Sequence, residues 1–256
     1  MAGAILQRWI ECGLSAARVS VVDPGRSDPP AAGVTLLSAL PSGLDEGTVV
    51  VLGVKPQALP AVASALSQLL REGHVVVSML AGVTLEQLRI SLGDDADLVR
   101  IMPNLPVALG KGVCALYAGT RTRAEAVLSA ERLLQPLGLV EKLADESQFN
   151  LLTAISGCGP AFVFRFIDAL AKAAVGLGFE AAQAARLAMA TVEGSSALAA
   201  MADEPPADLA DKVASKGGMT REGLDVLDAD GRLETLLIDT LRAARDRGEE
   251  LNRLSS

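Results

Sequence analysis

The pattern of apolar segments divides the chain near residue 146. Before this point, short apolar runs typical of strands alternate with segments of helical periodicity, and Thr84 and Gln87 have the spacing of a capping box. Strands are expected at 18–23, 34–37, 48–54, 75–80, 98–102 and 113–117, and helices at 5–10, 60–70, from 84 onward and at 122–134. After residue 146 only Ala-rich helical segments follow, at 161–177, 179–201 and 224–251. This order predicts a doubly wound parallel α/β domain over residues 1–146 and an all-helical domain over residues 147–256.

Charge and reactive side chains exclude several classes of function. The 256 residues include 31 acidic and 23 basic side chains, and a net charge of −8 opposes binding to nucleic acid or an anionic membrane. The start shows no signal-peptide pattern, and Cys12, Cys114 and Cys158 share no short spacing, which predicts reduced thiols, a cytoplasmic location and no metal site. His74, the only histidine, is expected on a surface turn. A Ser-His-Asp triad or a histidine-bearing metal site is thereby excluded.

Two features of the helical half concern apolar surface. The uncharged stretch 147–164 reaches membrane-helix length, but it contains Gln148, Asn150 and Pro160, so we interpret it as buried protein. Residues 173–179 and 197–202 also lack any charge. They favour a dimer interface, with an ordinary core as the alternative.

The start of the chain departs from the pattern of a dinucleotide-binding domain, which opens with a strand and a glycine-rich turn. Here Met1, Ala2 and Gly3 lead directly into the first helix. Without a central first strand, the strands near Val19 and Val49 would lack a common neighbour, and unpaired backbone groups would cost several kcal/mol. We therefore expect that the natural protein begins about ten residues upstream, where this architecture has its first strand and glycines. The codons upstream of Met1 would test this expectation.

Two loops that follow predicted strands could contact a bound dinucleotide, since ligands of doubly wound sheets bind at the carboxyl ends of the strands. Asp23 ends a strand where an acid can bind ribose hydroxyls, which favours NAD; Arg26 in the same loop could meet a 2′-phosphate, which favours NADP. An ordinary turn is the alternative for Asp23. The small residues Ala81 and Gly82 would let a nicotinamide approach the backbone.

The segment from Ser215 to Thr220 predicts an anion site. Gly217 and Gly218 precede a helix expected to begin near Arg221, so backbone N–H groups and the positive helix end would converge on one point. Such a site holds a carboxylate without dedicated arginines. A simple loop with an N-cap at Thr220 is the alternative.

The order and spacing of several segments, from Met1 to about Leu227, resemble the pyrroline-5-carboxylate reductase family. The matching segments are Met1-Ala2, as the tail of a glycine fingerprint, Val54-Lys55-Pro56-Gln57, Arg100-Ile101-Met102-Pro103-Asn104, Thr153 to Phe162, and Ser215 to Thr220. Cys158 stands where the family has serine, and Lys216 where it has proline. Leu105 replaces a threonine, which removes any hydrogen bond from that position.

The resemblance implies a Rossmann-like cofactor domain and an all-α dimerisation domain. It further implies reduction of 1-pyrroline-5-carboxylate to L-proline, the last step of proline biosynthesis, with NADPH, or NADH as the alternative cofactor. The expected partner is a second copy, as a homodimer or a higher homo-oligomer such as a decamer. The residues it places on the cofactor are Met1, Ala2, Asp23, Val54, Lys55, Pro56, Met79, Ala81 and Asn104. Those on the substrate are Gly217, Gly218, Met219 and Thr220, with Thr220 as the catalytic residue.

Two other functions remain open at this point. A related reductase could act on a different imine or on a β-hydroxy acid, but that second group uses a catalytic lysine in a glycine-rich helix start, which no segment after Thr153 supplies. A dimer without enzymatic activity is the other alternative, and the missing start of the glycine fingerprint is its only support.

Overall fold

The computed structural model describes residues 1–254, and the chain forms two compact units. The first consists of residues 1–158 with the stretch that begins at Ala244; the second runs from Gly159 to Ala243. The last strand ends at Lys142, and only helical elements follow among the described residues. The expected fold class, a doubly wound α/β domain followed by helices, is confirmed. The domain boundary expected at residue 146 stays a prediction. Residues 147–158 pack with the first unit, and the second compact unit begins at Gly159.

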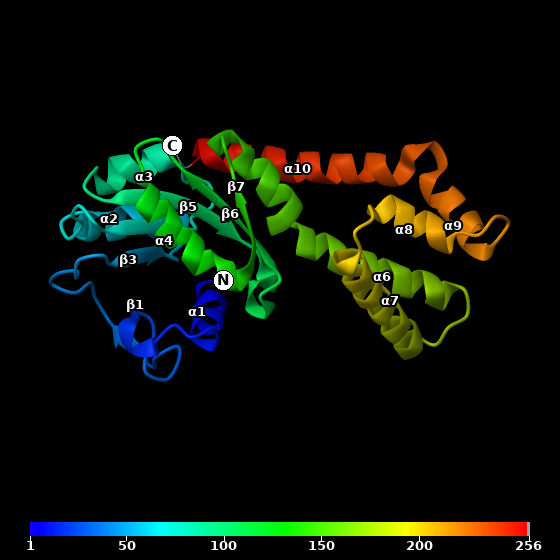
Figure 1. Ribbon diagram of the computed structural model, residues 1–256, viewed down its shortest axis with the longest axis horizontal. Coiled ribbons are helices and arrows are strands. Elements are labelled where there is room, and N and C mark those ends of the chain that lie inside the picture. The colour runs from blue at the N-terminus through cyan, green and yellow to red at the C-terminus, as the bar shows by residue number, and fades with distance from the viewer. Residues whose placement is uncertain (255–256) are drawn as a thin grey trace. The chain divides into compact units, whose positions relative to one another are not determined.

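A five-stranded sheet in the order β3-β4-β5-β6-β7 forms the centre of the first unit (Figure 1). Its strands are β3 (Val49–Leu52), β4 (Val75–Ser78), β5 (Asp97–Pro103), β6 (Gly112–Ala118) and β7 (Gly138–Lys142). Neighbouring strands are parallel except β5 and β6. The connection from β5 to β6 holds only a short 3-10 helix, Leu105–Leu109, and is too short for the crossover that a parallel pair needs. The sequence did not predict β7, whose side chains are only partly buried or exposed.

Strands β1 (Ser20–Val22) and β2 (Thr35–Leu37) form a separate, two-stranded parallel sheet. Neither strand is hydrogen-bonded to a strand of the five-stranded sheet. The strands expected near Val19 and Val49 therefore belong to different sheets, as the sequence predicted. β1 pairs only with β2. β1 is short and its side chains are largely exposed, as expected for a strand that is hydrogen-bonded to another strand on one side only.

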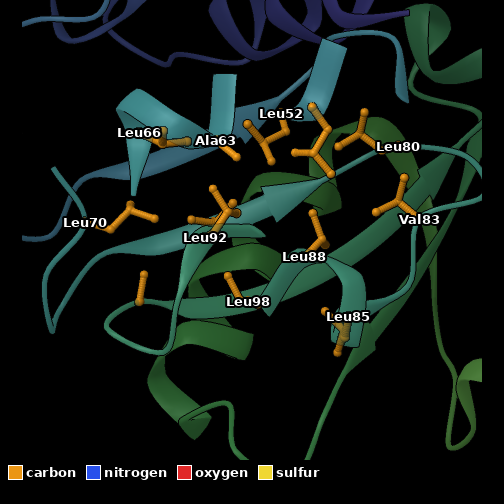
Figure 2. Packing of buried hydrophobic residues seen from close by; sticks show 13 residues of the cluster. Leu52, Ala63, Leu66, Leu70, Leu80, Val83, Leu85, Leu88, Leu92 and Leu98 are labelled. Carbon is orange, nitrogen blue, oxygen red and sulfur yellow. The ribbon is translucent and has the colours of Figure 1, made fainter. Parts of the chain in front are cut away.

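Helices cover both faces of the five-stranded sheet. α2 (Leu59–Leu66) and α3 (Leu85–Leu92) pack on one face, where Figure 2 shows their leucines against Leu52 and Leu98. α1 (Ala2–Glu11) and α4 (Ala124–Leu134) pack on the other. Strand β4 contributes to the hydrophobic clusters on both faces of the sheet. Val76 belongs to the cluster with α2 and α3, and Val75 and Val77 belong to the cluster with α1 and α4, because alternate side chains of a strand point to opposite faces. Thr84 and Gln87 form the predicted capping box at the start of α3.

The second unit is built from helices only. They are α6 (Gly159–Gly176), α7 (Ala181–Met201), α8 (Pro206–Val213) and α9 (Met219–Asp228), followed by α10 (Arg232–Leu254), whose last part belongs to the first unit. α5 (Phe149–Leu152) and a π-helix (Thr153–Gly157) precede them in the first unit. The single helix expected over 224–251 is wrong, because Asp230 and Gly231 take φ angles of 56° and 62° and separate α9 from α10.

Two expectations about burial are wrong. His74 is buried, with 3% of its surface exposed. Its polar ring tolerates burial because Nδ1 accepts a hydrogen bond from the Arg71 amide and Nε2 lies 3.1 Å from the Asp45 carbonyl oxygen. The stretch 147–164 is not simply buried protein either: Phe149 and Ala154 are buried, whereas α6 buries no residue within the single chain. The continuous helical stretch Glu146–Gly176 is the one described segment long and apolar enough to cross a membrane by length and composition.

Candidate active site

The carboxyl ends of β3, β4 and β5 meet at one edge of the sheet, because these strands are parallel neighbours. Val54, Lys55 and Pro56 follow β3, and Met79 and Ala81 follow β4. The Val54, Lys55 and Ala81 side chains are exposed there, and Pro56 and Met79 are half-buried. The structure thus brings five predicted cofactor residues to a single edge.

The first turn of α1 lies at the same edge. A Cβ atom at Gly53 would lie 2.9 Å from Cβ of Ala2 and 4.0 Å from Sδ of Met79, so only glycine allows this close approach of helix and strand end. Met1 is the N-cap of α1, and no side chain caps this helix. Its first amides and the positive end of its dipole are therefore available to an anion at the edge of the sheet.

Asp23 has a partner within its own loop. Its Oδ1 accepts a hydrogen bond of 3.1 Å from the Gly25 amide, and Nε of Arg26 donates to the Asp28 carbonyl oxygen at 2.8 Å. Both side chains remain exposed. A role for either residue at a ribose stays a prediction.

Asn104 differs from the other predicted cofactor residues because it is buried, with 6% of its surface exposed. Its Nδ2 donates to the Ser156 carbonyl oxygen at 2.9 Å, and its Oδ1 accepts from the Val113 amide at 2.8 Å. The side chain therefore joins the end of β5 to the start of β6 and to the π-helix. Direct contact with a cofactor stays a prediction.

The ion pair between Arg100 and Glu146, which lies beside this edge, was not predicted from the sequence. Nη1 of Arg100, on β5, donates to Oε1 of Glu146 at 2.5 Å, and the same oxygen accepts from the Leu85 amide at 2.8 Å. The Arg100 guanidinium also lies 4.1 Å above the Phe149 ring. Burial lowers the pKa of Arg100 from its ordinary value, and Glu146 opposes that shift. An arginine within an apolar strand was the available signal, since a buried cation requires a partner.

The predicted substrate residues form the start of α9 in the second unit. Gly217 has a φ of +70°, and the Gly218 amide donates to the Ser215 carbonyl oxygen at 2.9 Å. A Cβ atom at Gly218 would lie 2.5 Å from Oγ and 3.0 Å from the carbonyl oxygen of Ser215, so any larger residue there would require Ser215 to shift. α9 begins at Met219, two residues before the predicted start, which places Met219 and Thr220 in its first turn. No side chain caps α9, and both residues are exposed, so the amides of this turn can receive an anion.

A charged hollow of about 450 Å³ lies at the opposite edge of the sheet, around the first residue of β5. Its arginines are paired: Arg123 with Asp97 at 2.7 Å, and both Arg89 and Arg121 with Asp94. It contains none of the predicted site residues. Among the described residues no group of His, Cys, Asp and Glu side chains could hold a metal ion, and the three cysteines are free thiols.

Comparison with known proteins decides the family. Residues 146–251 match the family model described as pyrroline-5-carboxylate reductase dimerisation, and residues 1–82 match the model described as NADP oxidoreductase coenzyme F420-dependent. The pyrroline-5-carboxylate reductase of Pseudomonas aeruginosa is 34% identical over 255 residues, which cover 98% of this chain and 93% of that protein. This chain belongs to the pyrroline-5-carboxylate reductase family.

Solved structures of the reductase family agree. The pyrroline-5-carboxylate reductase of Coxiella burnetii is 31% identical, with a TM-score of 0.87 over 98% of this chain and 94% of that one. A Plasmodium falciparum pyrroline carboxylate reductase with NADP bound is 23% identical, with a TM-score of 0.78 over 98% of this chain and 96% of that one. The latter likeness supports the fold alone.

In this reductase, replacing Glu146 by Gln should lower the free energy of unfolding by about 2–3 kcal/mol. The change leaves Arg100 buried without a counter-charge, and the partial exposure of the Glu146 side chain keeps the cost below that of a fully buried pair. Urea unfolding followed by circular dichroism measures the effect. Glu141→Gln, on exposed β7, is the matched control and should stay within about 0.5 kcal/mol of wild type. An unchanged midpoint for Glu146→Gln would contradict the role of the pair.

Proposed function

We propose that this chain catalyses the NAD(P)H-dependent reduction of 1-pyrroline-5-carboxylate to L-proline, the last step of proline biosynthesis. The observation that carries the proposal is the glycine-led, uncapped start of α9, which offers backbone amides and a positive helix end to a single carboxylate. The substrate has one such carboxylate beside a C=N bond. The relatives named above support the same assignment.

The carboxyl edge of the first unit fits a dinucleotide. Gly53 leaves room that a Cβ atom would fill, and the uncapped first turn of α1 offers amides for a diphosphate. Val54, Lys55, Pro56, Met79 and Ala81 would line its course, with the loop that holds Asp23 and Arg26 beside the adenosine ribose. A bound reduced nicotinamide dinucleotide supplies the hydride.

The residues of α9 would bind and polarise the imine. The amides of Gly217 and Met219 hold the carboxylate at this turn, where the Gly218 amide already donates to the Ser215 carbonyl oxygen. The Thr220 hydroxyl donates a hydrogen bond to the imine nitrogen. Because an alcohol is a weak acid, Thr220 relays a proton or supports an already protonated iminium, and catalysis rests on positioning. His74 takes no part, since backbone groups engage both ring nitrogens.

A second copy of the chain completes the protein in this proposal. In the second unit only Ala184, Ala188 and Ala214 are buried apolar residues, while α6 exposes Phe164 and Phe166. So small a core cannot stabilise these helices by itself. We therefore assign the apolar length of α6 to a homodimer interface, in line with the dimerisation model that residues 146–251 match. Negative charge and free cysteines support a cytoplasmic enzyme without nucleic-acid or membrane partners.

The first experiment is the oxidation of reduced cofactor at 340 nm with 1-pyrroline-5-carboxylate. We expect turnover, with a higher kcat/KM for NADPH than for NADH because Arg26 lies in the loop after β1, where it can meet a 2′-phosphate. Arg26→Ala should narrow the difference between the cofactors. No oxidation of either cofactor by folded protein would sink the reductase assignment, and a preference for NADH would overturn the choice of NADPH.

Thr220→Ala should lower kcat about 10²-fold, the usual cost of removing one donor that stabilises developing charge. Thr220→Ser keeps the hydroxyl and should recover most of the rate. Thr240→Ala is the matched control, because that hydroxyl only donates to the Leu236 carbonyl oxygen of its own helix. Steady-state kinetics of the three variants measures the effect. Equal rates for Thr220→Ala and wild type would remove Thr220 from the mechanism.

Light scattering after gel filtration should give a multiple of the 26.4 kDa chain. Phe164→Glu places a charge in the apolar surface of α6 and should reduce the mass toward one chain. Leu128→Glu, at an exposed position on α4 of the first unit, is the control and should leave the mass unchanged. A monomeric wild type, or protein recovered only in membranes, would contradict the homodimer.

A further inference from the structure

Helix α1, whose first turn lies at the carboxyl edge of the sheet, is held near its other end by two side chains. Nε of Arg8 donates to the Pro136 carbonyl oxygen at 3.0 Å, and Nε1 of Trp9 donates to the Leu133 carbonyl oxygen. Both acceptors lie where α4 ends. Two directional bonds therefore fasten α1 to the end of α4, within the first unit.

The carbonyl oxygens at the end of α4 need donors from outside their own helix. The helix passes into a 3-10 turn, Gln135–Leu137, and Pro136 has no amide hydrogen to donate to the Leu133 carbonyl three residues before it. Gly138, with a φ of +135°, then turns the chain into β7. The last carbonyls of a helix carry partial negative charge, which favours a guanidinium beside them. The side chains of α1 thus cap α4.

The Arg8 side chain is confined on a further side by Gly110. This glycine follows the 3-10 helix Leu105–Leu109 with a φ of +67°, and a Cβ atom there would lie 3.0 Å from Cζ of Arg8. Nη1 of Arg8 also lies 3.9 Å from Oε2 of Glu11. With 29% of its surface exposed, the side chain is held by these neighbours and is not a freely moving surface arginine.

These bonds decide the orientation of α1, which its apolar contacts alone do not. Ile5 and Leu6 are buried, but hydrophobic contact is non-directional and lets a helix turn or slide. A hydrogen bond requires both a distance and an angle, and neighbouring side chains point about 100° apart around a helix. From Trp9 to Met1 the helix spans about 12 Å, so a rotation at one end is carried to the amides at the other.

We propose that Arg8 and Trp9 are positioning residues for the cofactor, which hold α1 so that the amides of its first turn face the diphosphate. This inference rests on the proposed reductase function and concerns the first unit alone. Gly53 brings Ala2 against the end of β3, so a small movement of α1 changes where its amides lie at the carboxyl edge. Both side chains act through α1 and not by contact with the cofactor.

The double variant Trp9→Phe with Arg8→Met tests the proposal, because it removes both donors and keeps most of the apolar bulk. One hydrogen bond corresponds to a factor of about five in an equilibrium constant. The cofactor would have to draw α1 back into place, so the Kd of NADPH, measured by isothermal titration calorimetry, should rise about five- to 25-fold. Each single variant should lie between wild type and the double variant. Adenosine 2′-monophosphate, which lacks the diphosphate, should bind within about twofold of wild type.

The matched control is Tyr117→Phe with Arg132→Met, which also removes one aromatic donor and one arginine from the first unit. Tyr117 packs with the cluster on the opposite face of the sheet, and Arg132 is exposed on α4. The Kd of NADPH should stay within about twofold of wild type in this control. It separates the loss of the α1 anchor from the loss of positive charge.

Two binding results would overturn the proposal: a Kd of NADPH unchanged in the double variant, or an equal rise for NADPH and adenosine 2′-monophosphate, which would indicate general loosening of the unit. If the double variant does not fold by circular dichroism, the single variants carry the same test. A folded wild type that binds no NADPH would instead overturn the proposed cofactor.

Hydrogen exchange of the α1 amides, measured without cofactor, separates this inference from the reductase assignment. In the double variant these amides should exchange at least about fivefold faster than in wild type, whether or not the wild type binds NADPH. The control variant should exchange at the wild-type rate. Unchanged exchange in the double variant would show that the two bonds do not hold α1 and would overturn the inference.

Discussion

The ion pair between Arg100 and Glu146 is the contact on which the arrangement of the first unit depends. Arg100 comes from the middle strand of the five-stranded sheet, and Glu146 begins the helical part of the chain. Removing the guanidinium from water is costly unless it is paired, so this position selects one path for the segment after β7. The Leu85 amide and the Phe149 ring complete the surroundings of the pair. The sheet, the start of α3 and the π-helix segment are thereby fixed together.

Both proposed anion sites have the same physical basis, which is an uncapped helix start next to a glycine. Gly53 lets the first turn of α1 reach the edge of the sheet, and Gly218 lets the chain turn tightly into α9. Backbone amides then provide the positive potential that arginines provide elsewhere. In our proposal, this is how a chain with a net charge of −8 binds a dinucleotide and a carboxylate. Reduction of an imine needs positioned donors more than a basic side chain, which agrees with a buried, engaged His74.

The helical unit has a different balance of forces. Its buried apolar residues are small alanines, and larger side chains such as Phe164, Phe166 and Met201 lie exposed on α6 and α7. Hydrophobic stabilisation is proportional to the apolar area that is removed from water. Because these large side chains stay exposed in the single chain, they contribute little to the stability of the unit by itself. Assembly and folding of this unit are therefore coupled in our proposal. The same apolar length explains why α6 resembles a membrane helix by composition.

The sequence by itself determined the alternation of strands and helices, the change to helices after residue 146, the capping box at Thr84 and the glycine-led start of α9. These depend on local periodicity and backbone preference. Only the tertiary structure decided the antiparallel course of β6, the break before α10, the burial of His74 and the partners of Arg100 and Asn104. The break before α10 is a local turn with positive φ at Asp230 and Gly231. The other three depend on which segments distant in sequence pack together, because the hydrogen bonds of buried polar groups are satisfied only there. Local pattern identifies such a polar residue, and tertiary packing selects its partner.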